Sequence, residues 1–302
     1  MSKLQDFWVE GTITAPLTPF KKNGDLNPDI LDKYVDFLVN NKIDGVFALG
    51  TMGEGMSLTV AERKQAAESW VRACRNKLKY VIVQVGTENL RSTKELAQHC
   101  QQVGVTAIAC LAPSYVKPDS VDALVDYMEQ VAACAPDLPF YLYDINFMTG
   151  IYLNSAEFLE KAGSRIPNLR GLKFSCRELP YLLDCKSCCG GKFQVMLGSD
   201  EQFLTALSIG VDVPVLNGYI GPTFDKLRTA FRNGDMDTAQ QQQKFARQLA
   251  RITAKHGGGM PAVKAIMELL GLDLGPVRLP LLPITAQQKE GLKRDLQKIG
   301  FL

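Results

Sequence analysis

Lys173 is the side chain of this sequence with the clearest chemical potential. It closes an apolar run over residues 169–173, a pattern typical of a buried strand. A lysine amine held away from water is favoured in its neutral form, and a neutral amine attacks carbonyl carbon to give a Schiff base. Such an imine is an electron sink for cleaving or forming carbon–carbon bonds. The other interpretation is a lysine that extends its amine into water at the end of a strand, and position alone leaves both open.

Tyr143 and the segment 50–55 offer partners for that chemistry. Tyr143 ends a second apolar run, residues 139–143, and its hydroxyl could move a proton at the reacting atoms. A strand tyrosine with an ordinary hydrogen bond is the alternative. Segment 50–55 reads Gly-Thr-Met-Gly-Glu-Gly. Its small residues would let backbone N–H groups approach an anion, and Thr51 adds a hydroxyl, although turns also use glycine for purely conformational reasons.

Other chemistries are disfavoured by the composition. The 302 residues include two histidines, too few for a histidine-rich zinc site or a relay of histidines. Cys185, Cys188 and Cys189 form a CxxCC cluster, but no second pair of ligands stands at zinc-binding spacing, so we predict no metal. Lys and Arg number 34 against 32 Asp and Glu, a balance that disfavours a nucleic-acid partner. Eight cysteines are well below the density of disulfide scaffolds, which favours reduced thiols.

The elements that must position these residues alternate along the chain. Short β-branched or apolar runs alternate with amphipathic stretches, the pattern of repeated βα units around a parallel sheet. Eight such units without a long linker predict a (β/α)8 TIM barrel, an α/β fold whose active site lies at the carboxyl ends of the strands. The first unit lacks the GxGxxG of a dinucleotide-binding fold. The predicted strands are residues 11–15, 45–49, 80–85, 107–111, 139–143, 169–173, 194–197 and 213–216, and the helical patterns include residues 28–41, 60–75, 92–103, 121–133, 155–161 and 201–208.

The last part of the chain is expected to be helical only. Residues 1–234 are predicted to form the barrel, and residues 235–302 a C-terminal helical extension packed on it as part of one structural unit. The extension would hold helices over residues 238–255, 261–270 and 285–299. No run of about 18 apolar residues appears, and residues 1–10 carry charge, so we expect a cytoplasmic protein without a membrane partner.

Taken together, these features resemble the dihydrodipicolinate synthase and N-acetylneuraminate lyase family of pyruvate-dependent class I aldolases. The resemblance spans nearly the whole chain, and the sialic acid lyase branch of the family is the most similar. The motifs that carry it are Gly50-Thr51-Met52-Gly53-Glu54, Tyr143, Gly171-Leu172-Lys173-Phe174-Ser175 and Gly198-Ser199-Asp200-Glu201, with further matches at residues 12–16, 18–19, 112–113, 264–267 and 278–281.

The resemblance implies reversible cleavage of N-acetylneuraminate to N-acetylmannosamine and pyruvate. Lys173 would form the covalent imine, so that no separate cofactor is implied, and Tyr143 would move the proton at the C4 hydroxyl. Thr51 and the loop amides would hold the substrate carboxylate. Tyr115 matches the aromatic residue that family members lend to the neighbouring subunit, which implies a homotetramer. Sugar contacts are implied for Ser175, Gly198, Asp200 and Glu201, because carboxylates suit hydroxyl donors.

Several positions depart from the family pattern. Met52 stands where a second threonine is usual, and one missing hydrogen bond to an anion weakens binding by about 1.5–3 kcal/mol. Residues 144–146 lack the usual proline, and residues 216–218 read Leu-Asn-Gly in place of Gly-Ser-Thr, which moves the expected serine contact to Asn217. Two alternatives therefore stay open: a pyruvate aldolase for a different 2-keto-3-deoxy sugar acid or aldehyde, and a weakly active barrel retained as a binding protein. Dihydrodipicolinate synthase activity is less expected, because that branch uses an arginine after the fifth strand and residues 144–149 contain none.

Overall fold

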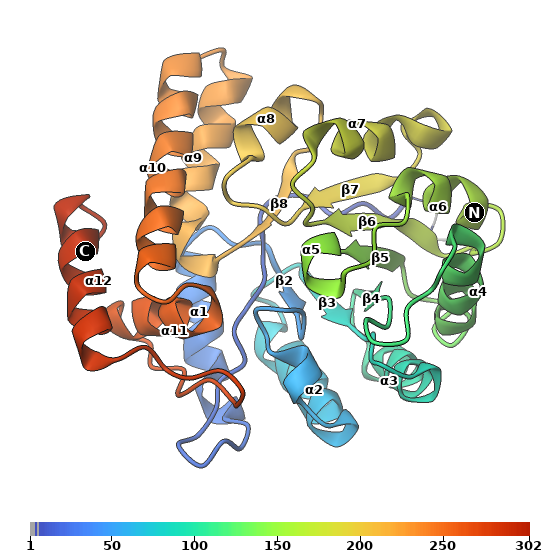
Figure 1. Cartoon of the computed structure of the whole chain (residues 1–302), viewed down its shortest axis with the longest axis horizontal. Coiled ribbons are helices and arrows are strands. Elements are labelled where there is room, and N and C mark those ends of the chain that lie inside the picture. The colour runs from blue at the N-terminus through green and yellow to red at the C-terminus, as the bar shows by residue number, and fades with distance from the viewer. Residues whose placement is uncertain (1–3, 5) are drawn as a thin grey trace.

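The computed structural model describes residue 4 and residues 6–302. Eight strands pair in parallel in chain order, and the last pairs with the first, which closes the sheet into a barrel (Figure 1). The predicted TIM barrel is confirmed. The strands are β1 Ile13–Thr14, β2 Gly45–Ala48, β3 Tyr80–Gln84, β4 Ala107–Leu111, β5 Phe140–Asp144, β6 Leu169–Phe174, β7 Gln194–Leu197 and β8 Val213–Leu216.

Helices cover the outside of the barrel (Figure 1). Their starts follow local sequence signals: Thr59 forms a capping box with Glu62 at the start of α2, and Asn89 and Ser120 cap α3 and α4 through their side chains. The helices of the barrel layer are α1 Leu31–Asn40, α2 Val60–Cys74, α3 Leu90–Val103, α4 Val121–Ala132, α5 Asn146–Thr149, α6 Ser155–Ala162, α7 Leu179–Ser187, α8 Phe203–Ser208 and α9 Gly221–Arg232.

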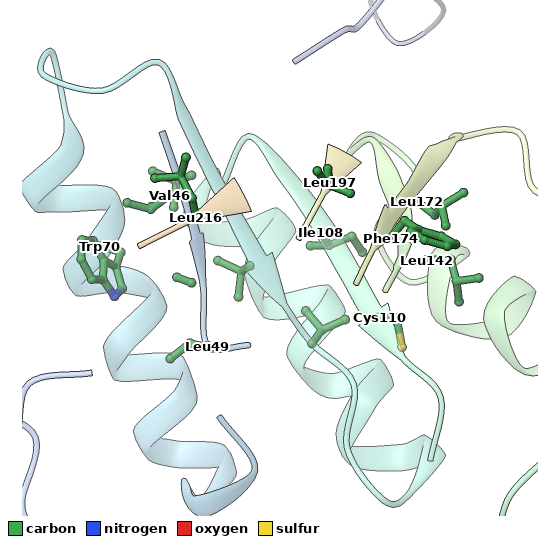
Figure 2. Packing of buried hydrophobic residues seen from close by; sticks show 14 of the residues in the cluster. Val46, Leu49, Trp70, Ile108, Cys110, Leu142, Leu172, Phe174, Leu197 and Leu216 are labelled. Carbon is green, nitrogen blue, oxygen red and sulfur yellow. The ribbon is translucent and has the colours of Figure 1, made fainter. Parts of the chain in front are cut away.

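Alternate strand residues serve two separate cores. Val46 of β2 and Leu172 of β6 belong to the large cluster between strands and helices, where Trp70 of α2 also packs (Figure 2). Phe47, Tyr141 and other strand residues of the opposite parity form a second cluster inside the barrel. Because Lys173 follows Leu172 directly, it lies on the inner face, which is where barrel chemistry takes place.

Gly171 fixes the path of β6 two residues before Lys173. Its φ of 150° is a conformation that side chains disfavour, and a Cβ there would lie 1.8 Å from the carbonyl oxygen of Gln194. The pairing of β5 with β6 also shifts register between Phe140 and Tyr141. Glycine at this position therefore lets β6 approach β7 closely and sets the direction in which the following side chains point.

Three further helices extend the fold after α9. Helix α10 Met236–Lys255 runs beside α9, and α11 Gly259–Leu269 and α12 Ala286–Lys298 pack against α10 (Figure 1). None of the helices in the described residues combines the length and apolarity needed to span a membrane.

Some predicted boundaries are wrong by one or a few residues. Strand β1 is limited to Ile13–Thr14, the only two of the five residues predicted as strand that pair with both β2 and β8. Strand β5 ends at Asp144 and β6 at Phe174, one residue later than predicted, because these two residues pair with each other. Helix α8 begins at Phe203 rather than at residue 201.

Candidate active site

Lys173 and Tyr143 lie side by side at the carboxyl end of the barrel. The register of β5 and β6 pairs them directly, and both side chains point inward. The Lys173 side chain is buried, with Nζ 4.1 Å from the centre of the Tyr143 ring and 4.3 Å from that of Phe47. Lys173 takes part in none of the ion pairs found among the described residues. Its amine is therefore sequestered between two aromatic faces and is not committed to a carboxylate.

Thr51 completes a short chain of hydroxyl groups beside this amine. Its Oγ1 lies 3.1 Å from the hydroxyl oxygen of Tyr143, within hydrogen-bonding distance. The loop that carries Thr51 is fixed at both ends: the Glu54 N–H donates to the Thr51 carbonyl, and the Gly55 N–H donates to the Gly50 carbonyl. The structure thus brings together the three residues that the sequence analysis singled out for chemistry, Lys173, Tyr143 and Thr51.

Gly198, at the end of the neighbouring strand β7, lies close to Lys173 and to Ser175 at the end of β6. A Cβ at position 198 would lie 2.9 Å from Lys173 Cε and 2.1 Å from Ser175 Oγ. The Gly198 N–H donates to the Phe174 carbonyl at 2.7 Å, which anchors the backbone there. Only glycine at position 198 therefore leaves Lys173 in its observed position.

Asp200 and Asn217 form a second polar pair at the mouth of the barrel. Asn217 Nδ2 donates to Asp200 Oδ2 at 3.0 Å, and the Asp200 carbonyl accepts from Gln243 of α10. Burial raises the pKa of Asp200 to about 6, although the Asn217 hydrogen bonds and the charge of Lys173 act to lower it. Met52, Asp200 and Asn217 all line a cavity of about 190 Å³ that reaches α10 and α11.

Tyr115 and Glu201 stand apart from these groups. The Tyr115 side chain is 91% exposed, and its backbone N–H donates to Glu88. A second cavity, of about 220 Å³, lies beside Thr51 and is lined by Met56, Glu88, Ser114 and Met148, among others. Glu201 is exposed at the start of the segment that leads into α8. The single chain therefore does not bring these two residues into contact with Lys173 or Tyr143.

Glu54 has a structural role that its place in the Gly50–Gly55 motif does not indicate. It is buried with a left-handed φ of 51°, and its Oε1 lies 3.3 Å from Lys264 Nζ on α11. Its Oε2 accepts from the Arg278 N–H at 2.8 Å. Burial lowers the pKa of Lys264 to about 8, and the Glu54 carboxylate opposes that shift. The C-terminal segment is thereby bonded to the loop that carries Thr51.

Asp144 was also missed as a structural group. Ser155 Oγ donates to its Oδ2 at 2.7 Å, and burial raises the pKa of this carboxyl. The sequence signal was its place directly after Tyr143. Within residue 4 and residues 6–302, no group of three or more His, Cys, Asp and Glu side chains is arranged to hold a metal ion.

Comparison with known proteins places this geometry in a family. The model of the dihydrodipicolinate synthetase family matches residues 8–299. N-acetylneuraminate lyase from Xenopus tropicalis is 40% identical over 97% of this chain and 98% of its own length, and the Rattus norvegicus enzyme of that name is 37% identical over 97% and 93%. A structure of N-acetylneuraminate lyase (sialic acid aldolase) from Aliivibrio salmonicida superposes with a TM-score of 0.93 at 38% identity, covering 97% of this chain and 98% of that one. The chain belongs to the dihydrodipicolinate synthetase family.

Proposed function

We propose that this protein is a class I pyruvate-dependent aldolase, a carbon–carbon lyase that cleaves N-acetylneuraminate to N-acetylmannosamine and pyruvate. The observation that carries the proposal is the buried Lys173 amine against the Tyr143 ring, with the Tyr143 hydroxyl 3.1 Å from Thr51. An amine, a phenol and a threonine hydroxyl in contact are the groups that imine formation and proton transfer need. The names of the relatives at 36–40% identity support this choice of substrate.

The proposed cycle uses these residues in order. The Lys173 amine attacks the C2 keto carbon, and loss of water gives an imine. Tyr143 accepts the proton of the C4 hydroxyl as the C3–C4 bond breaks, and the electron pair of that bond moves into the imine as an enamine. The aldehyde leaves, C3 takes up a proton, and water hydrolyses the imine to release pyruvate. The water lost at the start is regained at the end, and the lysine itself is the covalent catalyst, so the cycle calls for no metal or separate cofactor.

The remaining predicted residues would hold the substrate. Thr51 and the loop amides are assigned to the carboxylate, with Met52 beside them in place of a second hydroxyl. Ser175, Gly198, Asp200 and Asn217 line the direction in which the sugar would extend from Lys173, as the contacts of Gly198 with Ser175 and Lys173 support. Glu201 is assigned to the outer hydroxyl groups because its side chain is exposed.

We assign Tyr115 to a neighbouring copy of the chain in a homotetramer located in the cytoplasm. Tyr115 and Val116 are 91% and 76% exposed, and Met56 and Met148 near the second cavity are 50% and 58% exposed. Large apolar side chains gathered in this way favour a protein interface. In that assembly Tyr115 would reach the Thr51–Tyr143 pair of the other subunit.

Reductive trapping tests the lysine directly. Borohydride added with pyruvate should give a stable covalent adduct on the wild-type chain and none on Lys173→Ala, by intact mass. Peptide mapping should place the adduct on Lys173 rather than on Lys264, which is also buried. A chain that gains no adduct would instead be a barrel retained as a binding protein.

Aldehyde profiling tests the substrate. Condensation of pyruvate with N-acetylmannosamine should be faster than with shorter aldehydes at equal concentration. Met52 and Asn217 favour the second candidate, an aldolase for another 2-keto-3-deoxy sugar acid. Adduct formation without preference for N-acetylmannosamine would support that candidate.

A further inference from the structure

A polar cavity of about 420 Å³ lies at the end of the barrel opposite Lys173. Gly11, Lys79 and Asp212 line it, and each stands one or two residues before a strand, β1, β3 and β8 respectively. Because the strands are parallel, the residues that precede them share one end of the barrel, away from the carboxyl ends where Lys173 and Tyr143 lie. We call this space, which Trp8, Arg228 and Arg232 also line, the amino-end cavity.

Arg228 of α9 is a buried cation without a carboxylate partner. The residue is 8% exposed, and among residue 4 and residues 6–302 it belongs to no ion pair. Its Nη2 donates to the Gly11 carbonyl at 3.0 Å and to Thr12 Oγ1 at 3.1 Å. Its Nε and Nη1 donate to no group in the described part of the chain. A buried charge is costly unless it is paired, so the N–H groups of Nε and Nη1 favour an anion as their acceptor.

Arg232 and Lys79 add positive charge to the amino-end cavity. Arg232 follows Arg228 by four residues on α9, so both lie on one face of the helix. Its Nη2 donates to Asp212 Oδ2 at 3.3 Å, and Lys79 Nζ lies 3.8 Å from Asp44 Oδ1. Both pairs have long distances and exposed cations, and such pairs contribute little free energy. An incoming anion could therefore take over these cations at small cost.

The charge of the lining favours a dianion. Three cations, Lys79, Arg228 and Arg232, face two carboxylates, Glu10 and Asp212. A guanidinium binds phosphate with two parallel N–H donors, and a phosphate monoester carries a charge of about −1.5 to −2 near neutral pH. A carboxylate ligand would bring only one negative charge. Phosphate is therefore the group that fits this set of donors best.

Trp8 offers a surface for the rest of such a ligand. Its side chain lines the cavity and is 41% exposed, and Lys186 Nζ lies 6.0 Å from the centre of its ring. The volume of about 420 Å³ falls within the range of about 300–1,000 Å³ that is typical of small-molecule sites. It is more than an inorganic ion needs. The cavity thus has room for an organic group beside the phosphate.

We propose that the amino-end cavity is a binding site for a phosphate monoester, with the phosphate on Arg228 and Arg232 and the organic group against Trp8. This inference goes beyond the proposed function and does not depend on it, because the aldolase chemistry uses groups at the other end of the barrel. Arg228 also bonds to Gly11 and Thr12, directly before β1. The bound ligand should therefore stabilise the fold.

Phenyl phosphate is a suitable probe, because it joins a phosphate to an aromatic ring. Isothermal titration calorimetry should show one site per chain, with benzoate at least about tenfold weaker and phenol without binding, the loss expected when charge-assisted hydrogen bonds are missing. Trp8 fluorescence should change on binding, and Trp8→Phe should remove that change, since the other tryptophan, Trp70, is buried in the core. Absence of binding at millimolar phenyl phosphate, or equal affinity for benzoate, would overturn the proposal.

Exposed charges around the cavity supply variants that should fold. Arg232→Gln should weaken phenyl phosphate binding by about tenfold, the scale of one hydrogen bond to a charged group. Asp212→Asn should tighten it, because the change removes a repelling carboxylate and frees Arg232. Lys226→Gln is the matched control: Lys226 is exposed on the same helix, lies outside the cavity and carries the same charge. Equal affinities of Arg232→Gln and Lys226→Gln would refute the site.

Lys173→Ala separates this site from the proposed active site. The variant should bind phenyl phosphate with the affinity of the wild type, and saturating phenyl phosphate should leave the rate of pyruvate adduct formation on the wild type unchanged. Loss of binding in Lys173→Ala would place the ligand at the carboxyl end of the barrel and overturn the proposal. Absence of the pyruvate adduct from a wild type that binds phenyl phosphate would refute the aldolase proposal alone.

Discussion

Gly198→Ala should disable the protein by displacing its lysine. The added Cβ would lie 2.9 Å from Lys173 Cε and 2.1 Å from Ser175 Oγ. Carbon atoms in contact are normally about 3.5–4.0 Å apart, so the lysine must move by roughly 0.5–1 Å. The Gly198 backbone cannot easily yield instead, because its N–H is bonded to the Phe174 carbonyl at 2.7 Å.

The size of the effect follows from that displacement. A misplacement of about 1 Å in a reacting group costs roughly 100-fold in rate. The substitution adds one methyl group to a tightly packed position, for which overpacking costs about 1–3 kcal/mol of stability. We therefore expect a folded variant whose rate of pyruvate adduct formation falls by about two orders of magnitude, while its circular dichroism spectrum stays that of the wild type.

Gly50→Ala is the matched control for this experiment. A Cβ at position 50 would lie 3.5 Å from the Phe47 ring and 3.6 Å from the Tyr143 ring, which is ordinary van der Waals contact. It adds the same methyl group just after another strand of the barrel, β2, and we expect a loss of no more than about threefold. The assay is borohydride trapping with pyruvate at fixed times, read by intact mass. Equal rates for Gly198→Ala and the wild type would show that the lysine position inferred from this packing does not govern its reactivity.

Three other predictions concern buried charges. Because burial raises the pKa of Asp200 to about 6, the KM for the sugar aldehyde should rise as the pH falls through that value and the acceptor carboxylate becomes protonated. Asp200→Asn should abolish this rise in KM. A variant with the same pH profile as the wild type would contradict the assignment of Asp200. Lys264→Met should lower the free energy of unfolding in urea by about 3–5 kcal/mol, since it leaves the Glu54 carboxylate buried without its cation. Adding Glu54→Gln to the same chain should restore more than half of that loss. No recovery in the double variant would argue against the Glu54–Lys264 pair. With a Lys264 pKa of about 8, the unfolded wild type binds more protons than the native state above that pH. The contribution of Lys264 to stability should therefore rise between pH 8 and about 10. Lys264→Met should lack this rise.

The sequence predicted the parts of this molecule that depend on local pattern. Short β-branched or apolar runs between amphipathic stretches predicted all eight strands. The ends of these strands pointed to Lys173, Tyr143 and Thr51, which the barrel then brought together. The strand limits were less accurate because they depend on pairing between strands: Asp144 pairs with Phe174, and Phe174 also pairs with Leu197 of β7.

Contacts between distant segments escaped the sequence analysis. Glu54 and Arg278 are separated by 224 positions, and no local pattern indicates that their groups meet. The alanines of α10 were similarly uninformative, because alanine is the strongest helix former and needs no other explanation in a helix. Their effect, an open volume beside Asp200, arises only when α10 is placed against β8.

The bonds of Glu54 to Lys264 and Arg278 have a consequence for biosynthesis. All eight strands are complete at residue 216, yet the loop beside Thr51 gains these two partners only when a further 62 residues have been made. During translation from the N-terminus, a nascent chain of barrel length would therefore carry an unpaired acidic side chain next to its reactive centre. Competence for catalysis would then be acquired late, after the ribosome has delivered segments that contribute no atom to the reaction.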